Sequence, residues 1–251
     1  MKRAFLIIAS LLLVFSSATS FAQDDEEQPR RSSRGSGGIF GAGGGPSGAW
    51  YFINTDVLNS SLTDKGMPEL STDGMFLFGG HGYAYIIIVP NLRIGGIGMG
   101  GSMSETNVDD GTFNRSELAV GFGGVTLDYT IPFGRFHIAI GTMLGAGSYT
   151  LTLTRGPNTD KSWEDLFGDP LIPSDSRLEM INGFFAYQPA LTVEYDISPF
   201  IVASLKGGYF GTAGDTWELN GEFEVNEVPE FDMNNAFVRL DLTFGLFIGE
   251  N

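Results

Sequence analysis

The chain has 251 residues, a formal net charge of −16 and no cysteine. Its length fits one domain or two small ones. Fourteen basic residues against 30 acidic ones cannot supply the lysine and arginine footprint that nucleic-acid binding requires, so that class of partner is excluded. The lack of cysteine also excludes disulfides, thiol catalysis and zinc-thiolate sites.

The first 22 residues have the composition of a cleaved export signal. Lys2 and Arg3 precede an apolar stretch over residues 4–15, and Ser20-Phe21-Ala22 forms a small-x-small cleavage site. That stretch is shorter than the run of about 20 residues that a membrane-spanning helix needs. Residues 23–36 are charged and lack apolar periodicity, which predicts a disordered tether. Residues 37–251 then form the folded domain.

From residue 37 onward, apolar residues recur at every second position between glycine, proline and acidic breaks, as they do in strands. Near the C-terminus the even positions from Val238 to Ile248 are all apolar, whereas Arg239 and Asp241 lie between them. Eight segments fit this pattern, at residues 37–54, 74–89, 92–105, 115–131, 135–154, 182–197, 200–214 and 235–249. Most exceed the usual five or six residues of a soluble strand and match the 9 to 11 that a tilted strand needs to cross a bilayer.

Two sequence features predict irregularities within these strands. Glycine pairs at 79–80, 95–96, 123–124 and 207–208 coincide in several strands with a change in the phase of the alternation. A bulge that closes a narrow barrel produces such a change, so we expect bulges there. Pro189 lies on the apolar face of its segment and cannot donate to a ladder, which predicts a bulge or a local break.

The connections alternate in length. Short proline turns at 89–91, 132–134 and 197–199 alternate with long connections over 55–73, 106–114, 155–181 and 215–234. This alternation is typical of an up-and-down barrel in a bacterial outer membrane, with short periplasmic turns and longer external loops. Most acidic residues fall in the long connections or the strand ends beside them, which predicts an acidic external face.

Two of the long connections carry structure of their own. Thr55 is expected to cap a short helix that runs to Lys65, because Gly66 and Pro68 follow as stop signals. Asn220-Gly221 is a type I′ hairpin signal and predicts a ribbon that continues two strands outward. Acidic residues on that ribbon could bind calcium or magnesium, although their spacing matches no calcium loop and favours solvated side chains: Glu222, Glu224, Glu227, Glu230 and Asp232.

Aromatic residues gather toward both ends of the expected strands. Two interfacial girdles of a membrane barrel would have this pattern. The residues near the short turns are Tyr129, Phe133, Phe136, Tyr195 and Phe200, and those near the long connections are Trp50, Tyr51, Tyr149 and Phe185.

The eight strands, the export signal and the alternating loops together resemble the small OmpA-like and OmpX-like outer-membrane barrels. The likeness is architectural, covers residues 37–249 and includes no shared motif. Phe244-Gly245-Leu246-Phe247-Ile248 looks like the aromatic-ended last strand by which such barrels are recognised for insertion, although Gly249-Glu250-Asn251 follow it. The resemblance implies an all-β, antiparallel up-and-down transmembrane β-barrel of about eight strands with a short helix in the first external loop. It also implies a monomer in the outer membrane, in contact with lipid.

Side chains fill the lumen of a barrel this narrow. The alternation turns eight titratable residues inward: Arg93, Asp128, His137, Glu194, Asp196, Lys206, Arg239 and Asp241. Their opposite charges nearly neutralise one another, as buried charges must. We interpret this set as a network that packs the interior, in preference to a gated conduit or a binding site.

No metal site or cofactor is predicted, and no catalysis is expected. Only His81 and His137 supply imidazoles, and Ser102 or Ser104 could partner a histidine by position alone. The sequence therefore favours a structural or surface-interaction protein. A soluble exported barrel that binds an apolar ligand is one alternative, and it would turn Arg239 and Glu194 outward. A small porin-like diffusion pore is another, and it would need ten or more strands or an oligomer.

Overall fold

The computed structural model describes residues 40–157, 176–214, 217–219, 223–225, 231 and 234–248. The expected export signal (1–22) and tether (23–36) lie outside these ranges. Within them, no helix is both long and apolar enough to cross a bilayer.

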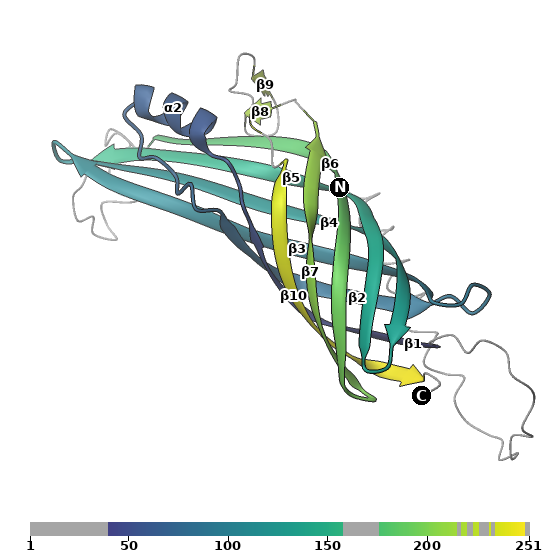
Figure 1. Cartoon of the computed structure of the whole chain (residues 1–251). Coiled ribbons are helices and arrows are strands. Elements are labelled where there is room, and N and C mark those ends of the chain that lie inside the picture. Colours follow the sequence, from purple (N-terminus) through teal and green to yellow (C-terminus); the bar gives the residue numbers. More distant parts are fainter. Residues whose placement is uncertain are drawn as a thin grey trace, which may run out of the picture. The chain divides into compact units, whose positions relative to one another are not determined.

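Eight long antiparallel strands form a closed ring (Figure 1). They are β1 (Phe40–Tyr51), β2 (Met75–Tyr85), β3 (Leu92–Asp109), β4 (Thr112–Phe133), β5 (Phe136–Pro157), β6 (Ser176–Ser198), β7 (Ile201–Ala213) and β10 (Asn235–Ile248). Each pairs with its neighbours in sequence order, and β10 returns to pair with β1 so that Phe40 lies opposite Ile248. The ring confirms the predicted eight-stranded up-and-down barrel. It also makes the glycine-rich first segment a full barrel strand.

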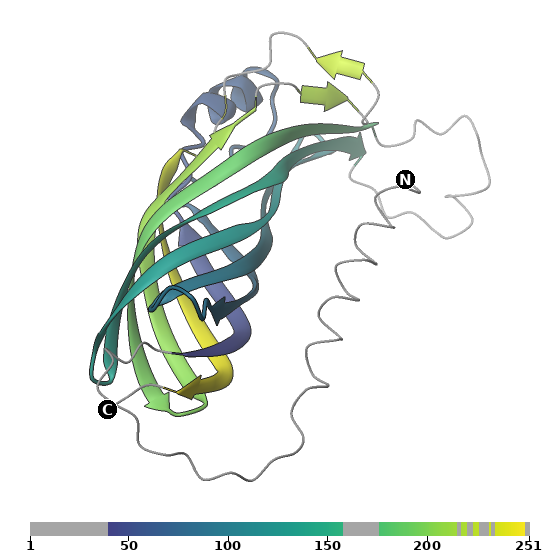
Figure 2. The same ribbon diagram turned by 90° about the vertical axis from the view of Figure 1, so that its right-hand side faces the viewer.

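The two ends of the barrel differ in their connections. At one end, which we call the short-turn end, brief segments join β2 to β3, β4 to β5 and β6 to β7. The opposite, long-loop end carries helix α2 (Asp56–Asp64) and the short strands β8 (Trp217–Leu219) and β9 (Phe223–Val225) (Figures 1 and 2). The short helix expected in the first long connection is thereby confirmed.

The long connection expected over residues 106–114 is wrong. Strands β3 and β4 continue through it, and Asp109 pairs with Thr112 across a two-residue turn. Asp110 and Gly111 in that turn have φ of 44° and 74°. Type I′ turns require positive φ at both central residues and favour Asp-Gly for that reason, so this dipeptide was the signal for a tight hairpin.

Two details of the long-loop end also differ from expectation. Thr55 precedes α2, but its hydroxyl makes no capping bond and donates instead to the carbonyl oxygen of Ser71 at 3.1 Å. Strands β8 and β9 form the expected ribbon, and β8 also pairs with the outer part of β6. Leu219 lies opposite Phe223, and the turn expected at Asn220-Gly221 lies outside the described residues.

The ladders run through all four glycine pairs without a register shift, so the bulges expected there are wrong. Among the described strands, a shift occurs between β6 and β7 at Asp196/Ser198. The break expected at Pro189 is confirmed. Tyr187 and Ala190 pair with β7 in one register, whereas Gln188 and Pro189 have no partner there.

A reversal in side-chain chemistry explains the change of phase at the glycine pairs. Even-numbered positions of β4 face inward along its whole length. Toward the long-loop end, inward Leu118, Val120 and Phe122 are apolar and buried, and inward Asn114 and Ser116 follow near the end of the strand. Beyond Gly123-Gly124 the inward residues become polar, with Asp128 buried, while Val125 and Leu127 face outward and are exposed.

Strand β5 reverses at the same level, since Gly145 lies opposite Gly124. Toward the long-loop end Tyr149 and Leu151 are buried, whereas toward the short-turn end His137 is buried and Ile140 is exposed. The same alternate positions of β5 face inward along the whole strand. The side chains at these positions change from polar to apolar along the strand, while the backbone alternation stays in phase.

The barrel interior therefore has two layers. The long-loop half holds a continuous apolar core that includes the edge-to-face ring pair of Tyr51 and Phe210 and is covered by Leu58 and Leu62 of α2. The short-turn half is polar. Tyr51 and Tyr149, expected in the outer aromatic girdle, are only 0% and 1% exposed, so this part of the expectation is wrong.

Candidate functional site

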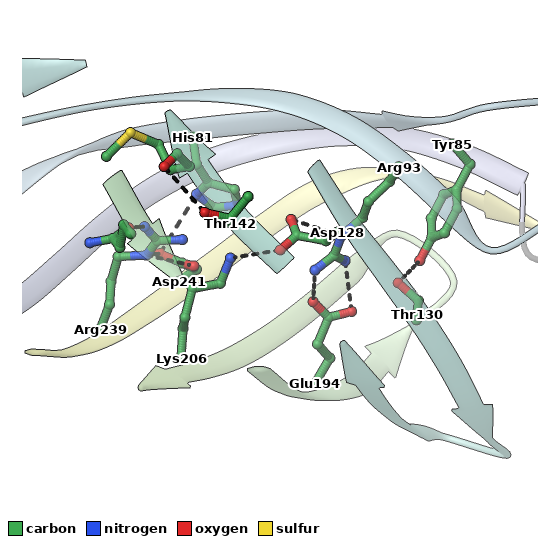
Figure 3. A network of polar contacts seen from close by, with 12 residues as sticks. His81, Tyr85, Arg93, Asp128, Thr130, Thr142, Glu194, Lys206, Arg239 and Asp241 are labelled. Atoms are coloured by element: carbon green, nitrogen blue, oxygen red, sulfur yellow. Dashed lines mark hydrogen bonds and ion pairs between the residues drawn. The ribbon is translucent and has the colours of Figure 1, made fainter. Parts of the chain in front are cut away.

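Six charged side chains from five strands meet in the short-turn half of the lumen (Figure 3). All are between 2% and 7% exposed. They point inward because each occupies an inward position of its strand. We call this set the lumen charge network: Arg93 on β3, Asp128 on β4, Glu194 on β6, Lys206 on β7, and Arg239 and Asp241 on β10.

Arg93 contacts two carboxylates of the lumen charge network. Its Nη2 lies 2.6 Å from Glu194 Oε1 and its Nη1 donates to Oε2 at 2.9 Å, so the pair is bidentate across the lumen. Its Nε lies 3.4 Å from Asp128 Oδ2. The guanidinium also lies 4.4 Å from the centroid of the Tyr83 ring, within cation–π range. Arg93 therefore compensates two carboxylates at once.

The remaining contacts connect the network to the apolar core. Lys206 Nζ lies 3.3 Å from Asp128 Oδ1, and Arg239 Nε lies 2.9 Å from Asp241 Oδ1. Arg239 Nη1 donates to Gln188 Oε1 at 3.5 Å, and Gln188 Nε2 donates to the Tyr51 hydroxyl at 2.8 Å. Since Tyr51 belongs to the core of the long-loop half, polar contacts bridge the two layers.

The network is electrically balanced. Its members carry three formal positive and three formal negative charges. Charges removed from water are tolerated only when they are paired and hydrogen-bonded, because the desolvation penalty otherwise exceeds the Coulomb attraction. The pairing therefore permits a charged layer inside the barrel.

His81 belongs to the same region although the sequence did not single it out for the lumen. Its Nδ1 lies 2.9 Å from Ser47 Oγ and its Nε2 lies 2.8 Å from Thr243 Oγ1. Asp241 Oδ1 lies 3.9 Å from the same Nδ1. The signal was available, since His81 shares the odd-numbered inward phase of Met75 and Leu77 in β2.

Two residues of the sequence-predicted lumen set lie apart from the network. His137 and Asp196 pair with each other, Nε2 to Oδ2 at 3.4 Å, and the Asp196 side chain is 31% exposed. The proposed serine partners of a catalytic histidine do not meet one. Ser102 and Ser104 are exposed on the outward positions of β3, whereas His81 points inward from β2.

The acidic residues considered for cation binding are mostly outside the described ranges, namely Glu222, Glu227, Glu230 and Asp232. Glu224 is described and lies exposed on β9. Across the described part of the chain, no cluster of three or more histidine, aspartate or glutamate side chains could hold a metal ion.

The free space within the network is small. A cavity of about 20 Å³ is lined by Arg93, Asp128, Glu194, Lys206 and Asp241 among others, which is room for about one water molecule. A barrel that binds an apolar ligand inside would turn these charges outward and leave an apolar interior. The inward direction of Arg239, Asp241 and Glu194 contradicts that alternative.

Comparison with known proteins gives likenesses of structure alone. No known protein family matches the chain, and no curated protein matches it. Similar solved structures include the attachment invasion locus protein Ail of Yersinia pestis, with 10% identity, a TM-score of 0.38 and coverage of 84% of this chain and 99% of that one. A major outer membrane protein of Thermus thermophilus has 7% identity, a TM-score of 0.42 and coverage of 83% and 99%. The outer membrane protease OmpT of Escherichia coli has 11% identity, a TM-score of 0.29 and coverage of 85% and 96%.

Proposed function

We propose that this protein is a monomeric, non-catalytic barrel of the bacterial outer membrane that holds a rigid, water-exposed wall of strands at the cell surface for contact with external partners. The reversal of side-chain chemistry at Gly123-Gly124 carries the proposal. On the short-turn side of that level the barrel is apolar outside and polar inside, as a transmembrane barrel is. On the other side, β3, β4 and β5 carry buried apolar residues inside, such as Met99, Val120 and Leu151. Their outward residues are polar, such as Ser102, Glu117 and Ser148, as on the surface of a soluble domain.

The outward residues of the short-turn half form the lipid-facing surface in this proposal. Large apolar side chains from six of the strands, β3, β4, β5, β6, β7 and β10, are exposed there. They are Ile94, Leu127, Ile140, Leu191, Leu205 and Leu240. A soluble monomer rarely leaves so much contiguous apolar surface in water. Aromatic residues near the short turns, including Phe133 and Phe200, are also exposed and suit the membrane interface.

Strand length indicates how far the wall extends into water. β4 and β5 have 22 residues each and β6 has 23, about twice the 9 to 11 that a bilayer crossing needs. Figures 1 and 2 show these strands continuing toward the long-loop end as a sheet. Its outward surface carries polar groups such as Ser148 and the exposed ion pair of Arg115 with Glu117 at 2.9 Å.

The interior favours a closed barrel over a diffusion pore. The cavity enclosed by the lumen charge network measures about 20 Å³, and an apolar core packs the long-loop half. The surroundings of His81 also argue against catalysis. Ser47 and Asp241 both lie on its Nδ1 side, whereas a serine nucleophile and an orienting acid require opposite ring nitrogens.

Single cysteines in the naturally cysteine-free chain test the proposal. Glu117→Cys on the wall should react with a membrane-impermeant maleimide in intact cells. Arg135→Cys, in the short turn between β4 and β5, should react only after the outer membrane is permeabilised. Leu127→Cys, facing lipid, should stay unreactive in both conditions, and the wild-type chain supplies the blank.

Labelling of Arg135→Cys in intact cells would reverse the orientation, and free labelling of Leu127→Cys would contradict the membrane location itself. Two further checks use the same preparation. The N-terminus of the membrane-extracted protein should be residue 23 if the export signal is cleaved. The unboiled protein should migrate differently from the boiled protein in a detergent gel, because closed membrane barrels resist detergent until heated.

A further inference from the structure

A second cavity, of about 470 Å³, lies at the long-loop end and shares no lining residue with the cavity of the lumen charge network. Helix α2 forms one wall through Leu58 and Leu62. The facing wall belongs to β5 and β6, where Leu151 lies opposite Met180 and Leu153 lies opposite Leu178. Trp217 of β8 also lines the cavity. Its size falls in the range of about 300 to 1,000 Å³ that is typical of small-molecule sites.

Basic groups mark the rim of this apolar cavity. Lys65 and Arg155 line it, and none of its described lining residues is acidic. The surrounding long-loop end is acidic, with Asp56, Asp64 and Glu69 in the same connection as Lys65. Among the described residues, the lining of this cavity is therefore a local exception, and its basic groups suit a negatively charged ligand.

Arg155 is held in place through its Nε and Nη2, and within the described ranges no hydrogen bond or ion pair involves its Nη1. Its Nε donates to Asn114 Oδ1 at 2.7 Å, and its Nη2 donates to the carbonyl oxygen of Lys65 at 2.7 Å. Lys65 is exposed, and its ammonium forms no ion pair within the described ranges. Arg177 also touches the rim, but its side chain pairs with Glu179 at 3.1 Å.

We propose that this cavity binds a long-chain fatty acid in its ionised form. The acyl chain lies among the leucines, Met180 and Trp217, and the carboxylate lies at the rim between Lys65 and Arg155. Burial of the chain supplies the affinity, at roughly 25 cal/mol per Å² of apolar surface. The two cations select the anion, because charge-assisted hydrogen bonds to a carboxylate are about twice as strong as neutral ones.

The test uses Trp217 as a reporter of occupancy. A full-length variant that keeps only this tryptophan (Trp50→Phe, Trp163→Phe) is placed in nanodiscs of phosphatidylcholine and titrated with dibromostearate, whose bromine atoms quench a neighbouring indole. The methyl ester of dibromostearate is titrated in parallel and gives the quenching caused by partition into the bilayer. We expect saturable quenching by the acid in excess of the ester.

Three substitutions in this background identify the site. Lys65→Gln should weaken the acid about tenfold, as expected for the loss of one charge-assisted hydrogen bond, and leave the ester unchanged. Ser61→Phe, on the face of α2 that lines the cavity, should abolish the saturable quenching. Arg115→Gln removes an external cation that does not line the cavity and should leave the acid titration unchanged within about twofold, as a surface charge does.

Three results would overturn the proposal. Equal quenching by acid and ester would mean that the cavity takes neutral apolar molecules. No quenching by either ligand would mean that the cavity is closed to acyl chains. Equal weakening by Lys65→Gln and Arg115→Gln would mean that general surface charge, and no built site, attracts the acid. A heat-dependent gel shift of each variant confirms that it remains folded.

Discussion

Replacing Arg93 by glutamine should destabilise the barrel far more than replacing its partner Glu194 by glutamine. Arg93 contacts both Glu194 and Asp128, at 2.6 and 3.4 Å. Its removal leaves two buried carboxylates, of which Asp128 keeps its contact with Lys206, and we expect a loss of about 3 to 5 kcal/mol in the free energy of unfolding. Glu194→Gln leaves Arg93 paired with Asp128, so its cost should be about 1 to 3 kcal/mol.

The double variant Arg93→Gln/Glu194→Gln provides the sharper comparison. It removes one charge of each sign and leaves the lumen charge network neutral, with Lys206 near Asp128 and Arg239 near Asp241. Its cost should fall below the sum of the two single costs by at least about 1 kcal/mol, since residues in direct contact are coupled. The measurement is reversible urea unfolding in lipid vesicles, followed by tryptophan fluorescence.

Arg115→Gln is the matched control, because it makes the same chemical change in an ion pair whose side chains are 42% and 35% exposed. It should cost no more than about 1 kcal/mol. If Arg93→Gln is no more costly than this control, the lumen charge network does not stabilise the barrel as argued. If the two single costs simply add in the double variant, the two side chains are not energetically paired.

Three further predictions concern packing, the helix and conduction. Gly124→Ala should cost about 1 to 3 kcal/mol in the same unfolding assay, because its new Cβ would clash with Met143 Sδ and the carbonyl oxygen of Leu144. Gly121→Ala is the control and should be tolerated, because open space surrounds its Cβ position. Asn59→Ala should destabilise the α2 connection by about 1 to 3 kcal/mol. The buried Asn59 amide accepts a hydrogen bond from the backbone N–H of Leu70 and donates one to the carbonyl oxygen of Leu70, both at 2.8 Å. Limited proteolysis near this helix should become faster, while the gel shift of the barrel stays unchanged. The wild-type protein should show no steady conductance in planar bilayers because the lumen is filled, and large stable openings would contradict this.

The strands were predictable because their signals are local. A period of two and the proline and glycine breaks placed all eight barrel strands, since inward and outward faces must differ wherever one face is shielded from water. Asp110-Gly111 is a type I′ turn signal and predicts a tight hairpin equally well, but the surrounding acidic residues favoured a long connection. In that case a strong turn signal was outweighed by a compositional one.

The sequence predicted which side chains point into the lumen, but it did not predict which of them contact each other. Alternation turned Arg93 and Glu194 inward, but they are 101 residues apart in sequence. Their bidentate contact exists only because the ring closes and its strand register brings β3 and β6 to the same level across the lumen. The inward direction of His81 was likewise predictable from the alternation in β2, whereas its contacts with Ser47 and Thr243 depend on the packing of β1 and β10.

The sequence alone determined the order, approximate length and inward positions of the strands, because these follow from the chemistry of neighbouring residues. Only the tertiary structure decided what the glycine pairs mean. A bulge and a change of surroundings both move apolar residues from one face of a strand to the other, so the two are indistinguishable along a single strand. The unshifted pairing of β4 with β5 resolves them: the backbone continues in phase, and the apolar residues change face where the barrel changes from polar to apolar inside.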